Sequence, residues 1–343
     1  MKRFIKNPVM NKVNSEQEPS IKIENIHILF KNLKKEIHKI LVGHEELINM
    51  VLLAIFTGGN CLIEGVPGLG KTLFVKTIGQ VLGLNFCRIQ FTPDLMPADI
   101  IGTTILNVTE SGKKYFEFQK GPLFSNIILA DEINRATAKT QSALLEAMGE
   151  HTISAGGNTY ALDQPFLVLA TQNPIDQEGT YSLPEAQLDR FMFKLLLNIP
   201  EVKEMVSIIE RFTVNDTIEV RRLMSGKSIE MIKKVVRDTP IASPMKSFVA
   251  KLCLASHPTQ KISPNFVKQY VAHGVSPRGA LAMVMGAKAR AISHGRFNVG
   301  MEDIQAVALS ALRHRIILNF EAGAEGITSD YIIEHLLQMS QDF

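Results

Sequence analysis

The stretch GVPGLGKT, residues 65–72, decides the fold of this chain. It matches the pattern G-x-x-x-x-G-K-S/T in full, between an apolar run at 60–64, typical of a buried strand, and an amphipathic segment at 71–82, typical of a helix. Glycines let such a loop curl until its N–H groups and the helix N-terminus point at one place, which suits a phosphate. We therefore expect a phosphate-binding loop that consists of Gly65, Val66, Pro67, Gly68, Leu69, Gly70, Lys71 and Thr72.

Side chains at the end of this loop indicate the ligand. Lys71 can neutralise the β- and γ-phosphates of ATP, and the hydroxyl of Thr72 can bind Mg²⁺. We expect Leu73, the next residue of the helix, to contact the nucleotide as well. The loop therefore predicts ATP and Mg²⁺ as cofactors, with Lys71 among the catalytic residues.

Two carboxylates and an amide follow apolar runs further along the chain. The run at 127–130 leads to Asp131 and Glu132, and the run at 166–170 leads to Asn173. Ligands of an open α/β sheet bind at the carboxyl ends of its strands, so we expect these side chains to meet there. Asp131 would hold the metal through water, Glu132 would polarise the attacking water, and Asn173 would position it.

Strands and helices alternate as far as about residue 200, which predicts an α/β fold with a mostly parallel sheet covered on both faces. From residue 201 the periodicity is helical, with no convincing strand. We expect a flexible leader at 1–25, an αβα nucleotide-binding domain at 26–200, and a linker with an all-α lid domain at 201–343. The other predicted elements are helices at 26–41, 45–56 and 138–149, strands at 86–91 and 193–199, and hairpins around Gly112 and at 151–161.

Composition restricts the class of protein. The chain has 343 residues, 45% of them hydrophobic and 21% charged, and no run of about 18 apolar residues that could span a membrane. The leader lacks an apolar stretch of the secretory type, so a cytoplasmic protein is expected. A formal charge of +3 is too small to argue for a nucleic-acid partner. Cys61, Cys87 and Cys253 show no disulfide or zinc spacing, so we expect reduced, buried thiols.

Seven stretches together resemble the AAA+ ATPases, and within them the MoxR family, from about residue 41 to residue 337. The resemblance implies an αβα nucleotide domain, a helical lid and a ring that is usually hexameric. It also implies chaperone-like work on partner proteins that often carry von Willebrand factor A domains. The stretches are the loop at 65–72, FTPD at 91–94, LADEINRA at 129–136, ATQNP at 170–174, LPEAQLDRF at 183–191, SPR at 276–278 and LRHR at 312–315.

Family motifs assign further residues. Val42 and Gly43 resemble the segment that contacts adenine, although the family more often has Gln where this chain has His44. Arg190 resembles the arginine finger that reaches the γ-phosphate of a neighbouring subunit. Arg278 resembles the lid arginine of the second sensor, which closes on the γ-phosphate. The resemblance thus adds Arg190 to the catalytic residues and Arg278 to the nucleotide contacts, with a salt bridge as the alternative role for both.

The sequence leaves the roles of three features open. Arg135 follows the two carboxylates and fits a subunit interface, a nucleotide contact or a structural role. The two hairpins resemble family insertions that can face a central pore, yet an ordinary solvated hairpin fits them nearly as well. The cluster at 313–315 fits a solvated or interdomain face better than a nucleic-acid site.

The function favoured by these residues is Mg²⁺-dependent ATP hydrolysis in a homo-oligomeric ring, hexameric by resemblance, that remodels a protein client. The ATPase subunit of a metal-chelatase complex has similar motifs and remains the alternative. A nucleic-acid motor is less favoured, because the hairpin at 151–161 contains no Lys or Arg. A nucleotide switch without turnover is disfavoured by Glu132 and Arg190.

Overall fold

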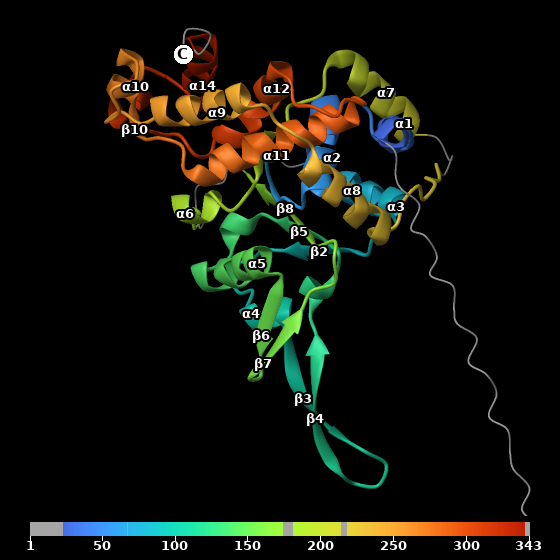
Figure 1. Ribbon diagram of the computed structural model, residues 1–343. Helices are drawn as coiled ribbons and strands as arrows, with labels where there is room; N and C mark the ends of the chain where they lie inside the picture. The colour runs from blue at the N-terminus through green and yellow to red at the C-terminus, as the bar shows by residue number, and fades with distance from the viewer. Residues whose placement is uncertain (1–22, 67, 174–180, 214–217, 340–343) are drawn as a thin grey trace, which may run out of the picture.

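The computed structural model describes residues 23–66, 68–173, 181–213 and 218–339 (Figure 1). The predicted leader up to residue 22, Pro67 of the loop and Pro174 lie outside these residues. The helices are α1 (Ile23–Ile37), α2 (Glu45–Thr57), α3 (Lys71–Leu82), α4 (Pro97–Ile101), α5 (Ala138–Glu150), α6 (Glu185–Leu188), α7 (Val202–Phe212), α8 (Gly226–Asp238), α9 (Ser243–Ala255), α10 (Asn265–Tyr270), α11 (Pro277–Ser293), α12 (Met301–Leu312), α13 (Phe320–Ala324) and α14 (Ser329–Met339), with short 3₁₀ turns η1 (Pro122–Phe124) and η2 (Ile133–Arg135). The strands are β1 (Cys61–Glu64), β2 (Phe86–Gln90), β3 (Gly102–Val108), β4 (Lys114–Lys120), β5 (Ile127–Asp131), β6 (Thr152–Ala155), β7 (Asn158–Ala161), β8 (Leu167–Gln172), β9 (Phe193–Leu196), β10 (Val271–His273) and β11 (Ile317–Leu318).

A five-stranded sheet in the order β2-β5-β8-β1-β9 lies at the centre of the part expected to bind the nucleotide. Every neighbouring pair is parallel, and Cys61 of β1 lies opposite Leu169 of β8 and Phe193 of β9. Parallel strands are joined by crossovers, so the carboxyl ends of all five strands share one edge. The predicted α/β fold class with a parallel sheet is confirmed.

Alternate strand residues point into two separate hydrophobic cores. Leu62, Ile128 and Val168 pack with residues of α4 and α5 on one face of the sheet. Ile63 and Leu129 pack with residues of α2 and α3 on the other face. All five side chains are fully buried. A strand covered on both faces has no side that must be polar, which explains the continuous apolar runs in the sequence.

The lid continues the second of these cores. Helices α8, α9, α11, α12 and α14 contribute buried residues to the same cluster as α2 and β1. The expectation that no strand follows residue 201 was wrong at one point, because β10 and β11 form a two-stranded antiparallel pair. Strands of two or three residues are too short to show an alternating pattern in the sequence.

Two hairpins extend from the side of the sheet that α4 and α5 cover, and β3–β4 projects furthest from the body (Figure 1). Near their bases Phe118 of β4 stacks on Tyr160 of β7, with ring centroids 4.5 Å apart. Further out, Leu106 lies opposite Phe116, and both are exposed. The projecting part of β3–β4 therefore presents an apolar cross-strand pair to solvent.

Element boundaries differ from expectation at two further places. Helix α1 begins at Ile23, so residues 23–25 of the predicted leader are helical, and it ends at Ile37 rather than near residue 41.

Cys61 and Cys253 are buried free thiols as expected, whereas Cys87 is half-buried. Cys87 lies on β2, which is an edge strand and is covered less completely.

Candidate nucleotide-binding site

The loop after β1 has the backbone that phosphate binding requires. Gly68 and Gly70 have φ angles of 85° and 76°, in the left-handed region that side chains rarely permit. A Cβ built on either glycine would meet no atom within 4 Å, so open space faces the loop. Helix α3 begins directly at Lys71, and its first N–H groups have no partner within the helix. The loop and this helix end can therefore cradle an anion.

Lys71 lies among acidic groups at the mouth of the loop. Its Nζ donates a hydrogen bond to the carbonyl oxygen of Gly65. Burial lowers the pKa of Lys71, and the carboxylates of Asp131, Glu132 and Glu64 act in the opposite direction. A bound triphosphate would add negative charge here and so favour the protonated ammonium further.

The apolar residues of the loop have a packing role. Leu69 and Leu73 contact the hydrophobic core that α2, α3 and the lid share. The nucleotide contact expected of Leu73 would therefore come from its backbone in the first turn of α3. Val66 and Thr72 are half-buried beside them.

The two carboxylates end β5 at the same edge of the sheet as the phosphate loop. Asp131 is the last residue of the strand, and its Oδ1 accepts a hydrogen bond of 2.6 Å from the hydroxyl of Thr171 on β8. Glu132 has a φ of 56°, and its N–H donates to the same hydroxyl at 2.9 Å. Asn173 follows directly after β8 and is buried. The structure thus places Asp131, Glu132 and Asn173 at the carboxyl ends of adjacent strands.

Two side chains of β2 that the sequence analysis missed contact these carboxylates. Arg88 donates to Oδ2 of Asp131 from Nε at 3.0 Å and from Nη2 at 2.7 Å. Gln90 donates from Nε2 to Oε2 of Glu132 at 2.9 Å. Polar residues within the predicted strand at 86–91 were the available signal. Their importance depends on β2 pairing with β5, which brings Gln90 opposite Asp131.

Arg135 also contacts Glu132, the carboxylate expected to activate water. Its Nη1 lies 3.0 Å from Oε2 of Glu132, in the turn η2 that follows β5. The arginine side chain is about half exposed, with 46% of its surface accessible, so this ion pair contributes little to stability. Glu132 is therefore held from two sides, by Gln90 and by Arg135.

The segment expected to contact adenine borders the connection from β9 to α7. A Cβ on Gly43 would collide with the carboxylate of Glu204 in α7. At the other end of this connection, the carbonyl oxygen of Leu197 would lie 2.8 Å from a Cβ on Gly65. The segment from Leu197 to Glu204 thus lies against two features: the turn that contains Val42 and Gly43, and the start of the phosphate loop.

Arg190 and Arg278 lie near each other, but at the opposite edge of the sheet from the phosphate loop. Arg190 precedes β9, whose first residue pairs with the first residue of β1, whereas the loop follows the last residue of β1. Nη1 of Arg190 donates to the carbonyl oxygen of Leu145 at 2.7 Å, and Arg278 lies 3.7 Å from the carboxylate of Asp189. Both arginines line a cavity of about 400 Å³ together with Gly59, which precedes β1.

The nucleotide contact expected of Arg278 stays a prediction, and its position bears on which subunit's nucleotide it could reach. A lid arginine that closes on its own γ-phosphate would have to reach the carboxyl edge of the sheet, and the structure does not bring Arg278 there. The reason is the way the lid docks. Arg315 is buried and donates to the Asp189 carboxylate at 2.7 Å and to the carbonyl oxygen of Phe191 at 2.7 Å. His314 adds a bond of 3.0 Å to Phe191, so the cluster at 313–315 is an interdomain contact.

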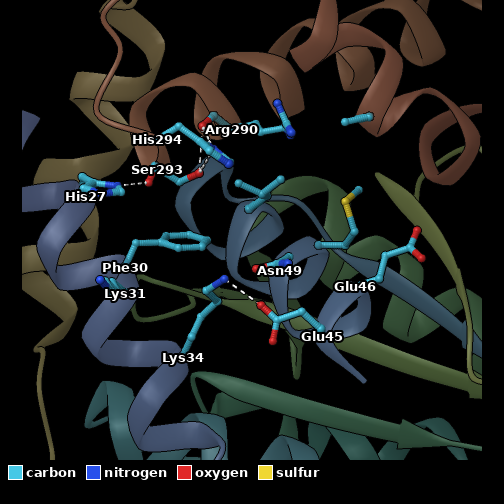
Figure 2. Close-up of a pocket in the computed structure, with 13 residues that line it drawn as sticks. His27, Phe30, Lys31, Lys34, Glu45, Glu46, Asn49, Arg290, Ser293 and His294 are labelled. Atoms are coloured by element: carbon cyan, nitrogen blue, oxygen red, sulfur yellow. Dashed lines mark hydrogen bonds and ion pairs between the residues drawn. The ribbon is translucent and has the colours of Figure 1, made fainter. Parts of the chain in front are cut away.

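A separate cavity of about 700 Å³ lies between α1, α2, α11 and α12. Figure 2 shows side chains that line it. Phe30 lines it together with an ion pair of 2.7 Å between Lys34 and Glu45. His27 bonds the carbonyl oxygen of Ser293 across the cavity at 2.7 Å. None of the predicted nucleotide residues lines it, so this cavity marks the seam between the nucleotide-binding part and the lid.

The oxygen donors beside the phosphate loop fit Mg²⁺. Thr72 offers a hydroxyl and Asp131 a carboxylate, and Mg²⁺ typically takes one or two such ligands together with phosphates and water. Within the described ranges, no group of three or more His, Cys, Asp or Glu side chains could hold a metal ion by itself. The residues therefore suit a metal that arrives with a nucleotide.

A parallel αβα sheet with a phosphate loop after β1, two carboxylates at the end of β5 and a helical lid defines a P-loop ATPase of the AAA class. Residues 60–193 match the ATPase family associated with various cellular activities (AAA), and residues 265–336 match the AAA lid domain.

Similar proteins narrow the class. Chaperone MoxR1 of Mycobacterium tuberculosis is 41% identical over 303 residues, which cover 88% of this chain and 79% of that protein. The protein YeaC of Bacillus subtilis is 38% identical over 92% of this chain and 95% of its own length. A solved structure from Cytophaga hutchinsonii, designated an ATPase, superposes with a TM-score of 0.86 at 44% identity and covers 92% of this chain and 95% of that one. The chain belongs to the MoxR family of AAA+ ATPases.

Membrane insertion through a helix finds no support in the structure. Of the helices that the structure describes, none is both long and apolar enough to cross a membrane.

Proposed function

We propose that this chain hydrolyses MgATP at a site completed by a second copy of itself, in a ring that is hexameric as in most of its family. One observation carries the proposal. The phosphate loop and the carboxylates occupy one edge of the sheet, whereas Arg190 and Arg278 occupy the opposite edge. A head-to-tail contact between copies would bring one subunit's arginine edge to the next subunit's loop, and such contacts close into rings.

Each side chain then has a defined task. Lys71 neutralises phosphate charge, and Thr72 with Asp131 holds Mg²⁺, which supplies further positive charge at the phosphates. Glu132 orients and polarises the attacking water, with Asn173 beside it. Arg190 and Arg278 of the neighbour would stabilise the charge that develops on the γ-phosphate.

An uncovered apolar helix face supports the assembly. Helix α7 has no buried residue, and one side of it carries only apolar residues. Its Glu204 lies against Gly43, so the helix borders the proposed nucleotide site. We propose that the neighbouring copy covers this face, because single copies seldom expose a continuous apolar surface. The face consists of Val202, Met205, Val206, Ile209 and Phe212.

The work driven by hydrolysis is proposed to be the remodelling of a protein client in the cytoplasm. A relative that is 41% identical carries the name chaperone, which supports this class of work. We propose a client with a von Willebrand factor A domain, as the family resemblance implies. Glu132→Gln protein, stalled with bound ATP, should retain such a client in a pull-down that is analysed by mass spectrometry. A pull-down that returns no protein beyond those retained by Lys71→Ala would contradict a client that depends on ATP.

The shared site is tested by mixing two inactive variants. Arg190→Ala should bind ATP but hydrolyse it poorly, and Lys71→Ala should not bind ATP tightly. In mixed rings an intact loop from the first meets an intact arginine from the second, so phosphate release should reappear. An arginine finger supplies about 10³ to 10⁵ in rate, which makes even partial recovery measurable.

The matched control uses a double variant. Mixing Arg190→Ala with protein that carries both Lys71→Ala and Arg190→Ala provides intact loops but no intact arginine, so this mixture must stay inactive. No recovery in the first mixture, despite subunit exchange demonstrated with labelled protein, would count against Arg190 acting across the interface.

A further inference from the structure

Side chains of β2 link the two catalytic carboxylates to each other. Nη2 of Arg88 donates to Oδ2 of Asp131 at 2.7 Å and also to Oε1 of Gln90. Gln90 in turn donates to Oε2 of Glu132 at 2.9 Å. The Arg88 guanidinium therefore covers Asp131, the residue expected to hold the metal. It also fixes the amide of Gln90, which holds Glu132, the residue expected to activate water.

The contact between Arg88 and Asp131 competes with a cation. Both oxygens of Asp131 accept hydrogen bonds, Oδ1 from Thr171 and Oδ2 from Arg88. A divalent cation at this carboxylate would meet the positive guanidinium, and like charges at such a distance disfavour each other. The Arg88 side chain is 45% exposed, whereas that of Asp131 is only 14% exposed. Arg88 is therefore the partner that can move into water when it leaves Asp131.

We propose that Arg88 is a positioning residue that releases Glu132 only when a divalent cation is bound beside Asp131. Arg88 leaves Asp131 when the cation arrives, and Gln90 loses the donor that fixes its amide. Gln90 then no longer holds Glu132, which keeps only its weak, half-exposed contact with Arg135, and its carboxylate becomes available to water. The inference rests on the proposed MgATP site and goes beyond it, because it names the residues that couple metal binding to the readiness of Glu132.

A purely structural role for Arg88 predicts a different outcome. If Arg88 only fastened the edge strand β2 to β5, its loss would loosen the site, and metal binding would weaken or stay the same. If Arg88 competes with the cation, its loss must tighten metal binding. The sign of the change in metal affinity therefore distinguishes a structural role of Arg88 from competition with the cation.

The first experiment titrates Mn²⁺ into the full chain with saturating ADP and follows free Mn²⁺ by electron paramagnetic resonance. Arg88→Met should bind Mn²⁺ about tenfold more tightly than the parent protein, because removal of a nearby like charge shifts such equilibria by about one decade or more. Arg88→Lys keeps a positive charge and should lie between the two. Arg237→Met, which removes an exposed arginine at the end of α8, should leave the affinity unchanged.

Two results would overturn the proposal. Equal or weaker Mn²⁺ binding by Arg88→Met, in protein with unchanged ADP affinity without metal and unchanged thermal unfolding, would show that Arg88 does not compete with the cation. Parent protein that binds ADP but shows no ADP-dependent Mn²⁺ site would overturn the inference together with the proposed metal site. Parent protein with such a site and no tightening in Arg88→Met would overturn the inference alone.

The second experiment tests the link through Gln90. Gln90→Leu removes the amide but keeps the size of the side chain, so it should loosen Arg88 and tighten Mn²⁺ binding. In an Arg88→Met background the same change should have no effect, because the residue through which it acts is gone. Equal effects in both backgrounds, or no effect in either, would overturn the link.

Discussion

Arg315→Met should destabilise the protein and also disable the edge of the sheet that carries Arg190 and Arg278. The Arg315 guanidinium is 3% exposed and donates to the Asp189 carboxylate and to the carbonyl oxygens of Asp189 and Phe191. These contacts fix the segment that carries Arg190. Removal of one partner of a buried ion pair costs about 3 to 5 kcal/mol, because the other charge stays buried.

The lower end of this range applies here. Asp189 keeps a hydrogen bond of 2.9 Å from the hydroxyl of Ser276, and Phe191 keeps its bond from His314. A loss of about 3 kcal/mol in a chain of this length corresponds to a fall of about 4 °C in the unfolding temperature. At room temperature the variant should remain folded and bind ATP at its own loop, but it should hydrolyse ATP slowly because Arg190 is misplaced.

The assay combines thermal unfolding followed by circular dichroism with phosphate release. Arg313→Met is the matched control from the same cluster, since Arg313 pairs with Asp330 at 2.9 Å and donates to the carbonyl oxygen of Lys194 at 3.4 Å but does not contact Asp189. It should retain hydrolysis. Mixing Arg315→Met with Lys71→Ala should restore activity, because the first variant still offers an intact loop. An unchanged unfolding temperature, or normal hydrolysis by pure Arg315→Met, would refute the reasoning.

Five further substitutions have definite expected outcomes. Lys71→Ala should abolish tight MgATP binding while Glu132→Gln binds normally without turnover; equal losses of affinity for a fluorescent ATP analogue would contradict these roles. Arg278→Ala should leave the nucleotide affinity of dilute subunits unchanged and slow hydrolysis by the assembled protein, so a loss of affinity in dilute protein would place Arg278 at its own loop. Burial lowers the pKa of His314 far below its usual range, so at low pH the unfolded chain binds a proton that the folded chain does not. The free energy of unfolding should therefore decline by up to about 1.4 kcal/mol for each pH unit as the pH falls below about 6.5. His314→Gln should flatten the fall of the unfolding temperature between about pH 7.5 and 5.5, and an unchanged slope would exclude His314 as its source. Ile209→Asp, on the exposed face of α7, should leave the fold intact and reduce assembly measured by light scattering, whereas unchanged assembly would show that this face is not covered by a neighbour.

The sequence was sufficient where function depends on neighbouring residues. The phosphate loop at 65–72 carries its own signal, since the strand before it and the helix after it are both visible as local patterns. The carboxylates at 131–132 and Asn173 could be assigned to strand ends for the same reason. Their catalytic roles stay predictions, as does the division of the chain at residue 200.

The sequence was insufficient where function depends on the order of strands or on the docking of the lid. Arg88 is separated from Asp131 by many residues and becomes its neighbour only because β2 pairs with β5. The pattern at 276–278 identified Arg278 as a lid arginine, but only the buried contacts of Arg315 show which edge of the sheet the lid covers. Such information resides in long-range packing, which no local pattern records.

The hydrophobic core shared by the sheet and the lid has a practical consequence for anyone who wishes to cut the chain into parts. Gly286 of α11 lies so close to Phe193 of β9 that a Cβ there would come within 2.8 Å of the aromatic ring. A fragment that ended at residue 200 would leave this ring and the lid-facing side of α2 in water, and it should aggregate rather than fold. The isolated lid would expose the complementary surface. Biochemical dissection of this protein therefore has to proceed by point substitution in the whole chain rather than by truncation.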